Sequence, residues 1–433
     1  MESPCSYGAT AGLRLRANFD KDLDSFSTEF WRHLQAYSVR QLTQPLDSLN
    51  AFTAILTALF SETGGCLFGL PRRDFDRALL WRRTTSNTAE TEIAESGWKG
   101  KAPTWSWVAP RQHFAYSDED KPFEIGGEVW CGSLLLWIES YTFGDEWGFR
   151  AIRADGECWS WSPGFHDTSP ARSYMAYACR REFFNLISSF QFPAGIPVEL
   201  DGLEGDAEIE YLDDEDSDEE ANDDEFSDDY VDTIHDVYHS SLTRRWPHYE
   251  IFWGEAFASR LEEDGSLPPK ISNELSQRYG DLPNKERLIF TEAIVAYFRI
   301  KRRDSTPAIM DIIDDKDNFV GAIIEGEVVP SLLVPKRSGI QCEFIALSLS
   351  ALPSWGLAAK GLVPELSEEN DIIDKHGLQY PDRDGVLQND DTPIVNVMLI
   401  GWQDRCARRI SVGRIFLSEW TKAEYHLKWI ALG

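Results

Sequence analysis

Two neighbouring segments decide how this chain folds: LFGLPRRDFDRALLWRR at residues 67–83 and GWKGKAPTWSWVAP at residues 97–110. In the first segment, Phe75 and Ala78 begin an apolar series at helical spacing, which predicts a short amphipathic helix. Pro71 suits the first turn of a helix, because a proline there leaves no N–H unpaired. The helix is expected to end in the apolar residues Leu79, Leu80 and Trp81.

The second segment contains two indoles on one face of a predicted strand. Pro103 disfavours the helical region for the residue before it. Trp105 and Trp107 then alternate with Ser106, as in a strand with one buried face. Two indoles bury a large area and need partners for their N–H groups, so we interpret the pair as a plug of the core. The alternative, an aromatic platform for a ligand, has no support from the neighbouring residues.

These residues resemble a known family. The sequence Gly-Leu-Pro at 69–71, the predicted helix at 75–81 and Ala-Pro-Thr-Trp-Ser-Trp at 102–107 are similar to a stretch of the fungal heterokaryon-incompatibility (HET) proteins. The resemblance extends from about residue 28 to residue 433, apart from an acidic insertion. The other similar stretches are residues 31–52, RLIFTEAIVAYFRI at 287–300, 314–324, EFIALSLS at 343–350 and NVMLIGW with its continuation at 396–433.

In that family, these stretches follow an N-terminal signature domain with an LSYCWG-like turn and a W.LQE helix. Neither motif occurs in this sequence, so the chain is expected to correspond to the region downstream of the domain. The resemblance implies a role in fungal non-self recognition, which triggers cell death in mixed hyphae. Because the death signal is credited to the signature domain, the chain is expected to be a truncated or regulatory scaffold.

The charge of the chain is concentrated in one tract. The 433 residues carry a net charge of −31, and residues 199–232 contain 19 acidic residues and no Lys or Arg. Without this tract, 54 acidic residues face 42 basic ones. Like charges at this density repel each other, so the tract is predicted to be a disordered insertion. A second function stays open, in which the tract recruits a basic protein through Asp213, Asp214, Glu215, Asp216, Asp218, Glu219 and Glu220.

Composition also limits the partners and the compartment. The acidic charge disfavours nucleic acid and anionic membranes, so the expected partner is a protein; nothing in the sequence sets the oligomeric state. The seven Cys include no Cys-x-x-Cys pair, which excludes a zinc ribbon or a thioredoxin-like motif. Their odd number and wide spacing are typical of reduced intracellular thiols. The longest apolar run, residues 134–138, is too short to cross a bilayer. We therefore expect a soluble cytoplasmic protein, with the nucleus as an alternative.

No pattern in the sequence predicts catalysis, a cofactor or a metal. The sequence lacks the Gly-x-Ser-x-Gly elbow, the phosphate-binding loop and the dinucleotide fingerprint. His235 and His239 have the spacing of two zinc ligands on a helix, but Asp236 replaces the glutamate of zinc proteases. A solvated helix edge is the preferred interpretation of this pair. The chain is thus predicted not to be an enzyme.

The predicted fold class is α+β, with a β-rich C-terminal half. The expected regions are a helical and α+β region at 1–198, the acidic insertion at 199–232 and a β-rich region at 233–433, which could share one core with 28–198. Period-two alternation favours a strand over a helix at 287–300. The other predicted elements are helices at 28–37, from 48, at 173–189, 249–260 and 420–426, a hairpin of 128–141 with 147–153, and strands at 319–325, 343–349, 395–402, 408–418 and 429–432.

Overall fold

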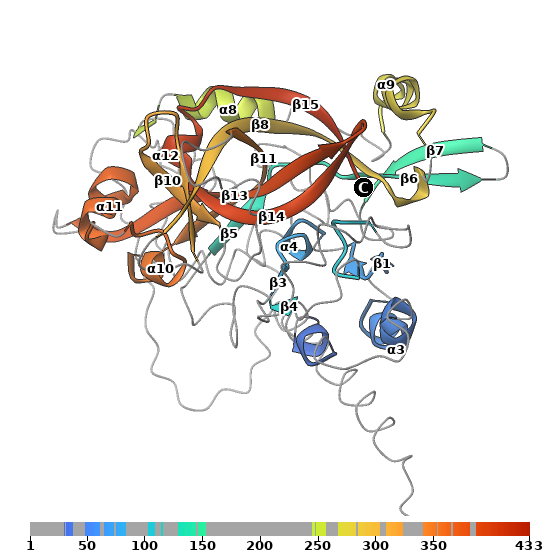
Figure 1. Ribbon diagram of the computed structural model, residues 1–433, viewed down its shortest axis with the longest axis horizontal. Helices are drawn as coiled ribbons and strands as arrows, with labels where there is room; N and C mark the ends of the chain where they lie inside the picture. The colour runs from blue at the N-terminus through green and yellow to red at the C-terminus, as the bar shows by residue number, and fades with distance from the viewer. Residues whose placement is uncertain are drawn as a thin grey trace, which may run out of the picture.

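A computed structural model describes residues 30, 32–37, 48–60, 65–72, 75–83, 103–108, 114–115, 129–143, 146–152, 245–246, 248–256, 267–282, 285–303, 309–323, 341–352, 354–364, 367–381 and 387–433. These residues form helices and one large, mainly antiparallel sheet (Figure 1), which confirms the α+β class. In the described part of the chain, no helix has the length and apolar character needed to cross a lipid bilayer.

Eleven strands make up the central sheet, and most of them come from the C-terminal half. They are β5 (Val129–Ser133), β6 (Ile138–Phe143), β7 (Glu146–Ala151), β8 (Ile289–Arg302), β9 (Met310–Ile313), β10 (Phe319–Ile323), β11 (Gln341–Leu352), β12 (Leu378–Pro381), β13 (Leu387–Gln403), β14 (Cys406–Phe416) and β15 (Tyr425–Leu432). The strands predicted at 319–325, 343–349, 395–402 and 408–418 correspond to β10, β11, β13 and β14, and are confirmed.

The sheet closes on itself. Strand β8 pairs with β11, and the pairing continues through β13, β14, β10 and β9 back to β8. Strand β15 also pairs with β8 and meets β14 through one parallel pair, Ala407 with Leu432. Because closure gives a strand a partner on both sides, the ring strands have few free backbone groups.

Strand β8 confirms the strand predicted at 287–300, and the alternation of its side chains separates two cores. Ile294, Phe298 and Ile300 face the apolar cluster enclosed by the ring. Ala293 and Val295 face the opposite way, into the largest apolar cluster among the described residues. We call these two sides of the sheet the inner face and the outer face.

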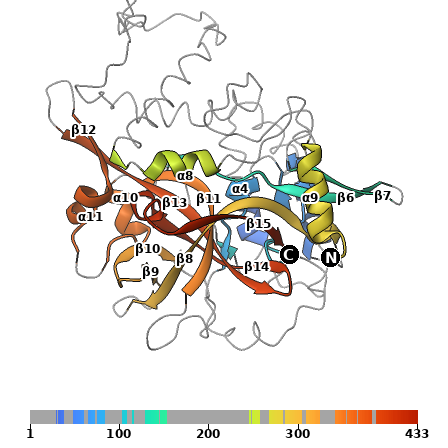
Figure 2. The same ribbon diagram turned by 90° about the horizontal axis from the view of Figure 1, so that it is seen from above.

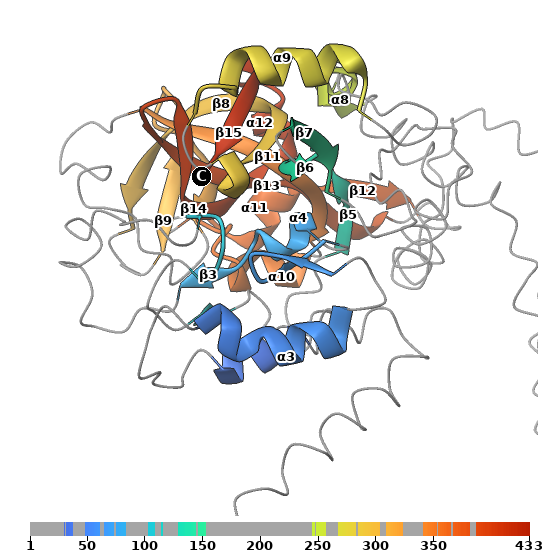
Figure 3. The same cartoon turned by 90° about the vertical axis from the view of Figure 1, so that its right-hand side faces the viewer.

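The N-terminal segment covers the outer face. Residues 32–37 are helical and α3 spans Ser48–Phe60, which confirms both predicted helices. Their aromatic rings meet edge to face, with Phe30 5.4 Å from Phe60 and Phe52 5.5 Å from Trp107. Figure 3 shows α3 on one side of the sheet, with α8 and α9 on the other. The smaller elements of this segment are β1 (Cys66–Leu67), β2 (Leu70–Pro71), α4 (Phe75–Ala78), β3 (Arg82–Arg83) and β4 (Phe114–Ala115).

Other helices cover the remaining apolar surfaces. Figure 2 shows α8 (His248–Ala256) beside the sheet, where Phe252 joins the inner core. Helix α9 (Pro269–Tyr279) places Leu275 and Tyr279 against Phe290 and Trp429. The remaining helices are the 3-10 turn η2 (Lys285–Arg287), α10 (Ser354–Ala359), α11 (Glu369–His376) and α12 (Leu417–Trp420).

The tryptophan motif is not a strand, so that prediction was wrong. Residues 104–108 form consecutive turns, in which Ser106 N donates to Pro103 O over 3.0 Å and Val108 N donates to Ser106 Oγ over 3.1 Å. Local hydrogen bonds therefore replace those of a ladder. Pro71 likewise lies in β2, not at a helix start, because Phe68 and Gly69 have positive φ and turn the chain into a hairpin with β1.

Two more boundaries differ from the predictions. The predicted first hairpin arm, 128–141, is divided, because Ser133 bonds to the backbone of Leu135 and ends β5. Strand β5 pairs with β11, while β6 and β7 form the hairpin. The helix predicted at 420–426 lies earlier in the chain, at Leu417–Trp420. Residues from Tyr425 onwards pair with β8, so the last strand, predicted at 429–432, spans 425–432.

Several predictions fall on residues that the structure does not describe. These are the helix at 173–189, the acidic tract at 199–232 and the pair His235 and His239. The division into 1–198 and 233–433 stays a prediction. The outer-face cluster contains residues of both ranges, such as Trp107 and Val295.

Candidate functional site

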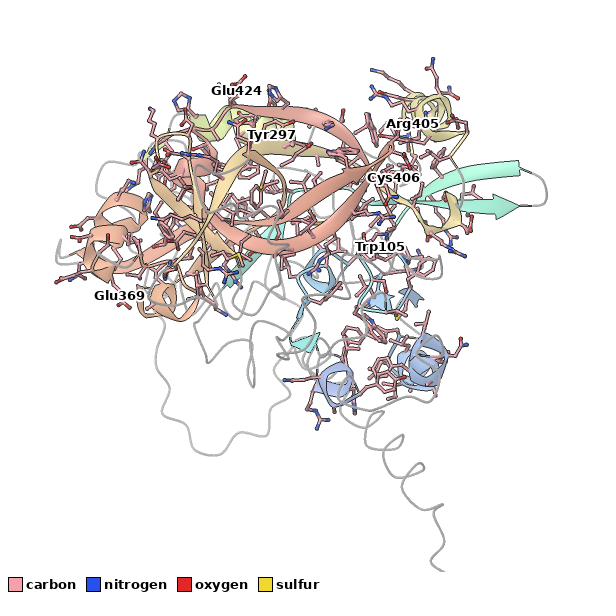
Figure 4. All side chains as sticks on the ribbon, in the orientation of Figure 1. Trp105, Tyr297, Glu369, Arg405, Cys406 and Glu424 are labelled. Atoms are coloured by element: carbon pink, nitrogen blue, oxygen red, sulfur yellow. The ribbon has the colours of Figure 1, made fainter. Side chains whose placement is uncertain are left out.

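Every residue of the predicted tryptophan motif is buried. Trp81, Trp105 and Trp107 are each at most 1% exposed, and Figure 4 shows Trp105 between the N-terminal elements and the sheet. The rings of Trp105 and Trp107 thus lie in the interior, as expected if the pair plugs the core. The other motif residues, Leu79, Leu80, Pro103 and Ser106, are buried as well.

Three side-chain donors of the motif bind the backbone around them, whereas the buried Trp105 Nε1 has no hydrogen-bond partner among the described residues. Trp81 Nε1 donates to Trp105 O over 2.8 Å, and Trp107 Nε1 donates to Gly69 O over 2.9 Å. Ser106 Oγ donates to Phe68 O over 2.6 Å. These hydrogen bonds join the segment of residues 68–81 to residues 105–107 and fix the positions of Trp81 and Trp107.

Strand β14 holds the motif from the other side. The guanidinium of Arg409 is 3.7 Å from the centre of the Trp81 ring and donates to Trp81 O. Arg409 N donates to Thr104 Oγ1 over 3.1 Å, and Thr104 N donates to Gly433 O over 3.1 Å. A buried cation over an indole face is a stabilising contact, so this side chain ties the N-terminal segment to the sheet.

Among the described residues, a buried histidine and serine come nearest to the arrangement of a catalytic pair. His376 Nδ1 is 2.6 Å from Ser418 Oγ, and its ring stacks on Phe416 at 4.1 Å. Burial, followed by the nearby Lys375, Lys422 and Arg245, lowers the pKa of His376 to about 3. A base of that pKa is weak near neutral pH.

The geometry also differs from a nucleophilic triad. Glu419 Oε1 lies 3.7 Å from His376 Nδ1, the nitrogen that faces Ser418, whereas a triad uses opposite nitrogens of the ring. Both His376 and Ser418 are 1% exposed. The pair is therefore best explained as a buried polar contact of α11 with α12. This pair could not be predicted from the sequence, because 42 residues separate its members.

A row of polar residues crosses the outer face between two apolar clusters. The register places Ser133, Ser348, Asn396 and Arg414 on neighbouring strands, and all four are buried. Asn396 Nδ2 donates to Ser348 Oγ over 3.2 Å and to Ser350 Oγ over 2.8 Å. Such a row penalises a shift in strand register, because a one-residue slip would bury these groups against the other face.

One exposed surface on the outer face is built from aromatic and charged side chains. We call Tyr297, Glu343, Trp402 and Lys428 the aromatic patch. Tyr297 is 42% exposed and Trp402 is 39% exposed. Tyr297 lies directly across the β8–β11 pairing from Glu343, and Figure 4 labels it over β8.

The indole of Trp402 is held in place within this patch. Trp402 Nε1 donates to Glu343 Oε2 over 2.6 Å, and Lys428 Nζ donates to Glu343 Oε1 over 2.8 Å. Lys428 Nζ also lies 4.1 Å from the centre of the Trp402 ring. A side chain fixed by such contacts loses little rotamer freedom when a partner binds it.

Among the residues that the structure describes, no group of three or more His, Cys, Asp or Glu side chains is arranged to hold a metal ion. Cys66 and Cys342 are not activated thiols, because burial raises the pKa of Cys66 to about 12 and that of Cys342 to about 11.

Comparisons with protein-family models, with curated proteins and with solved structures found no match to this chain.

Proposed function

We propose that this chain is a non-enzymatic scaffold that binds another protein, and that it acts in non-self recognition and its cell-death response in fungi. The recognition role comes from the resemblance to the HET family. The binding role is supported by the aromatic patch. Trp105 and Trp107 are buried and cannot contact a partner, so the exposed rings of the patch are the better candidates for binding.

The observation that carries the binding role is the fixed, partly exposed indole of Trp402. Tryptophan and tyrosine are enriched among the residues that dominate binding energy at protein interfaces. The contacts to Glu343 and Lys428 hold this ring before any partner arrives. Tyr297, across the strand pair from Glu343, adds a second exposed aromatic ring to the patch, and the charged pair supplies a polar rim.

The experiment attaches a photoreactive group to the proposed surface. A photoreactive phenylalanine analogue replaces Tyr297, the chain is expressed in its own cells, and adducts are identified by mass spectrometry. We expect one protein adduct that Trp402→Ala reduces at least about tenfold, since loss of an interface hot spot costs about 2 kcal/mol.

The matched control is Ile251→Ala, which truncates a residue that is 59% exposed on α8. It should leave the adduct and the thermal midpoint unchanged. Trp402→Ala should also weaken the incompatibility response of mixed hyphae. Equal adduct yields from the two variants would refute binding through the aromatic patch.

The second candidate is an acidic adaptor that recruits a basic protein through residues 199–232. The 19 acidic residues of this tract, without a Lys or Arg, favour it. Deleting 199–232 should abolish binding to a basic test protein, such as a histone-like tail, and added salt should screen that binding. The Tyr297 adduct should persist in the deleted chain, which separates the two functions.

A further inference from the structure

The β6–β7 hairpin extends beyond the rest of the sheet. Strands β6 and β7 pair over six positions, but only Ile138 and Glu139 of β6 also pair with β8. Figures 1 and 2 show the hairpin projecting from the sheet as a two-stranded ribbon. Phe149 anchors its base by packing 5.4 Å from Phe290. A two-stranded ribbon has little stability of its own in water, so this one is suited to gaining a further strand.

In the described part of the chain, no strand pairs with the outer edge of β7. Among the described strands, β7 pairs only with β6. An unpaired strand edge presents N–H and C=O groups that another strand can use. The ribbon also carries an exposed aromatic ring, since Tyr141 is 40% exposed. Arg150 covers part of that ring at 5.5 Å from its centre.

The sequence of β7 is complementary to itself. Its six residues, EWGFRA, contain one acidic position, 146, and one basic residue, Arg150, with Gly148 midway between them. When two copies of this strand run antiparallel about Gly148, position 146 of each copy lies opposite Arg150 of the other. Opposite charges directly across a strand pair are stabilising, and like charges are destabilising.

We propose that β7 pairs with β7 of a second copy of this chain, antiparallel and centred on Gly148. This arrangement is a closed two-fold interface, in which each copy offers the same strand. It joins the two central sheets into one continuous sheet across the dimer axis.

Gly148, at the centre of the proposed pairing, has no side chain and so leaves room for the Tyr141 ring. A Cβ at Gly148 would lie 2.7 Å from Cζ of Tyr141, so the Tyr141 ring lies across the ribbon at this position. In the dimer, the two Tyr141 rings meet next to the axis and cover each other. Arg150 donates through Nε to Glu139 over 2.6 Å, and the guanidinium has further donors for a second carboxylate.

The test measures the mass of the full chain in solution by sedimentation. We expect a dimer at micromolar concentration. Glu146→Arg places like charges opposite each other twice, and should weaken the dimer about tenfold. The matched control is Glu424→Arg, the same charge reversal at a residue that Figure 4 shows over β15, away from the hairpin. This control should keep the wild-type dissociation constant.

A mixing experiment tests the register. Arg150→Glu alone should also weaken the dimer, but mixing it with Glu146→Arg restores opposite charges at both positions and should restore a mixed dimer. A monomeric wild-type chain at about 100 μM, well above the usual range for a specific interface, would overturn the proposal. Equal dissociation constants for Glu146→Arg and Glu424→Arg would overturn it too, and this comparison holds even if Arg150→Glu fails to fold. None of these outcomes depends on the aromatic patch.

Discussion

At the scale of single residues, Gly69 shows how closely the tryptophan motif is fitted. Its φ is +85°, and a Cβ there would lie 2.6 Å from Nε1 of Trp107, the atom that donates to the Gly69 carbonyl. Gly69→Ala should therefore combine backbone strain with a displaced indole, and lower the free energy of unfolding by about 3 kcal/mol.

Gly65 provides the control for that variant. Its φ is +71°, but nothing lies within 4 Å of a Cβ built on it. Gly65→Ala should cost only the strain of the left-handed backbone, about 1 kcal/mol. Urea unfolding of both variants measures the difference. If the two losses were equal, the contact of Gly69 with Trp107 would contribute nothing to stability.

His376 makes stability depend on pH. Its pKa is about 3 in the folded protein and close to 6.5 when unfolded, so between these values the unfolded chain binds the extra proton. Stability should therefore fall as pH drops below about 6.5, by about 2 kcal/mol between pH 7.5 and pH 5. His376→Gln should flatten this part of the profile in urea unfolding. A slope unchanged by the substitution would assign the pH dependence to other groups.

At the scale of elements, one buried carboxylate connects the N-terminal segment to the β6–β7 hairpin. Glu139 of β6 accepts two hydrogen bonds from Arg72, of 2.5 and 2.7 Å, and is 4% exposed. Arg72→Met removes a charge partner from a buried group, so it should cost about 3 kcal/mol in thermal or urea unfolding.

The pair of Arg405 with Asp281 is the exposed counterpart. Their side chains are 52% and 70% exposed. Arg405→Met should lower the free energy of unfolding far less than Arg72→Met does, because solvent screens exposed ion pairs. If Arg72→Met and Arg405→Met lowered the free energy of unfolding equally, burial of Glu139 would not determine how strongly its ion pair stabilises the fold.

Elements with strong local patterns could be predicted from the sequence, and contacts between distant residues could not. Period-two spacing at 287–300 predicted β8, and the strand packs against apolar clusters on both of its faces. The burial of Trp105 and Trp107 was predictable from their size, but their turn geometry was not, since it depends on hydrogen bonds of Ser106. His376 meets Ser418 only because α11 packs on α12.

At the scale of the whole molecule, the outer-face core joins the two ends of the chain. Trp107 and Phe52 belong to the same apolar cluster as Val295 and Met398. Trp107→Ala should therefore destabilise β8 as well as the N-terminal helices, with a loss of about 3–5 kcal/mol. Hydrogen exchange of β8 amides checks this expectation, with Trp402→Ala as the exposed control. Unchanged exchange in β8 would show that the two halves unfold separately.

The difference in exposure between Trp402 and the interior indoles makes tryptophan fluorescence a reporter of binding at the aromatic patch. Trp402 is 39% exposed, whereas Trp81, Trp105 and Trp107 are shielded from water. Acrylamide should quench the emission of Trp402 while leaving that of the shielded rings, and a ligand seated on this indole should block the quencher. Occupancy of the surface could then be followed by fluorescence without attaching a dye.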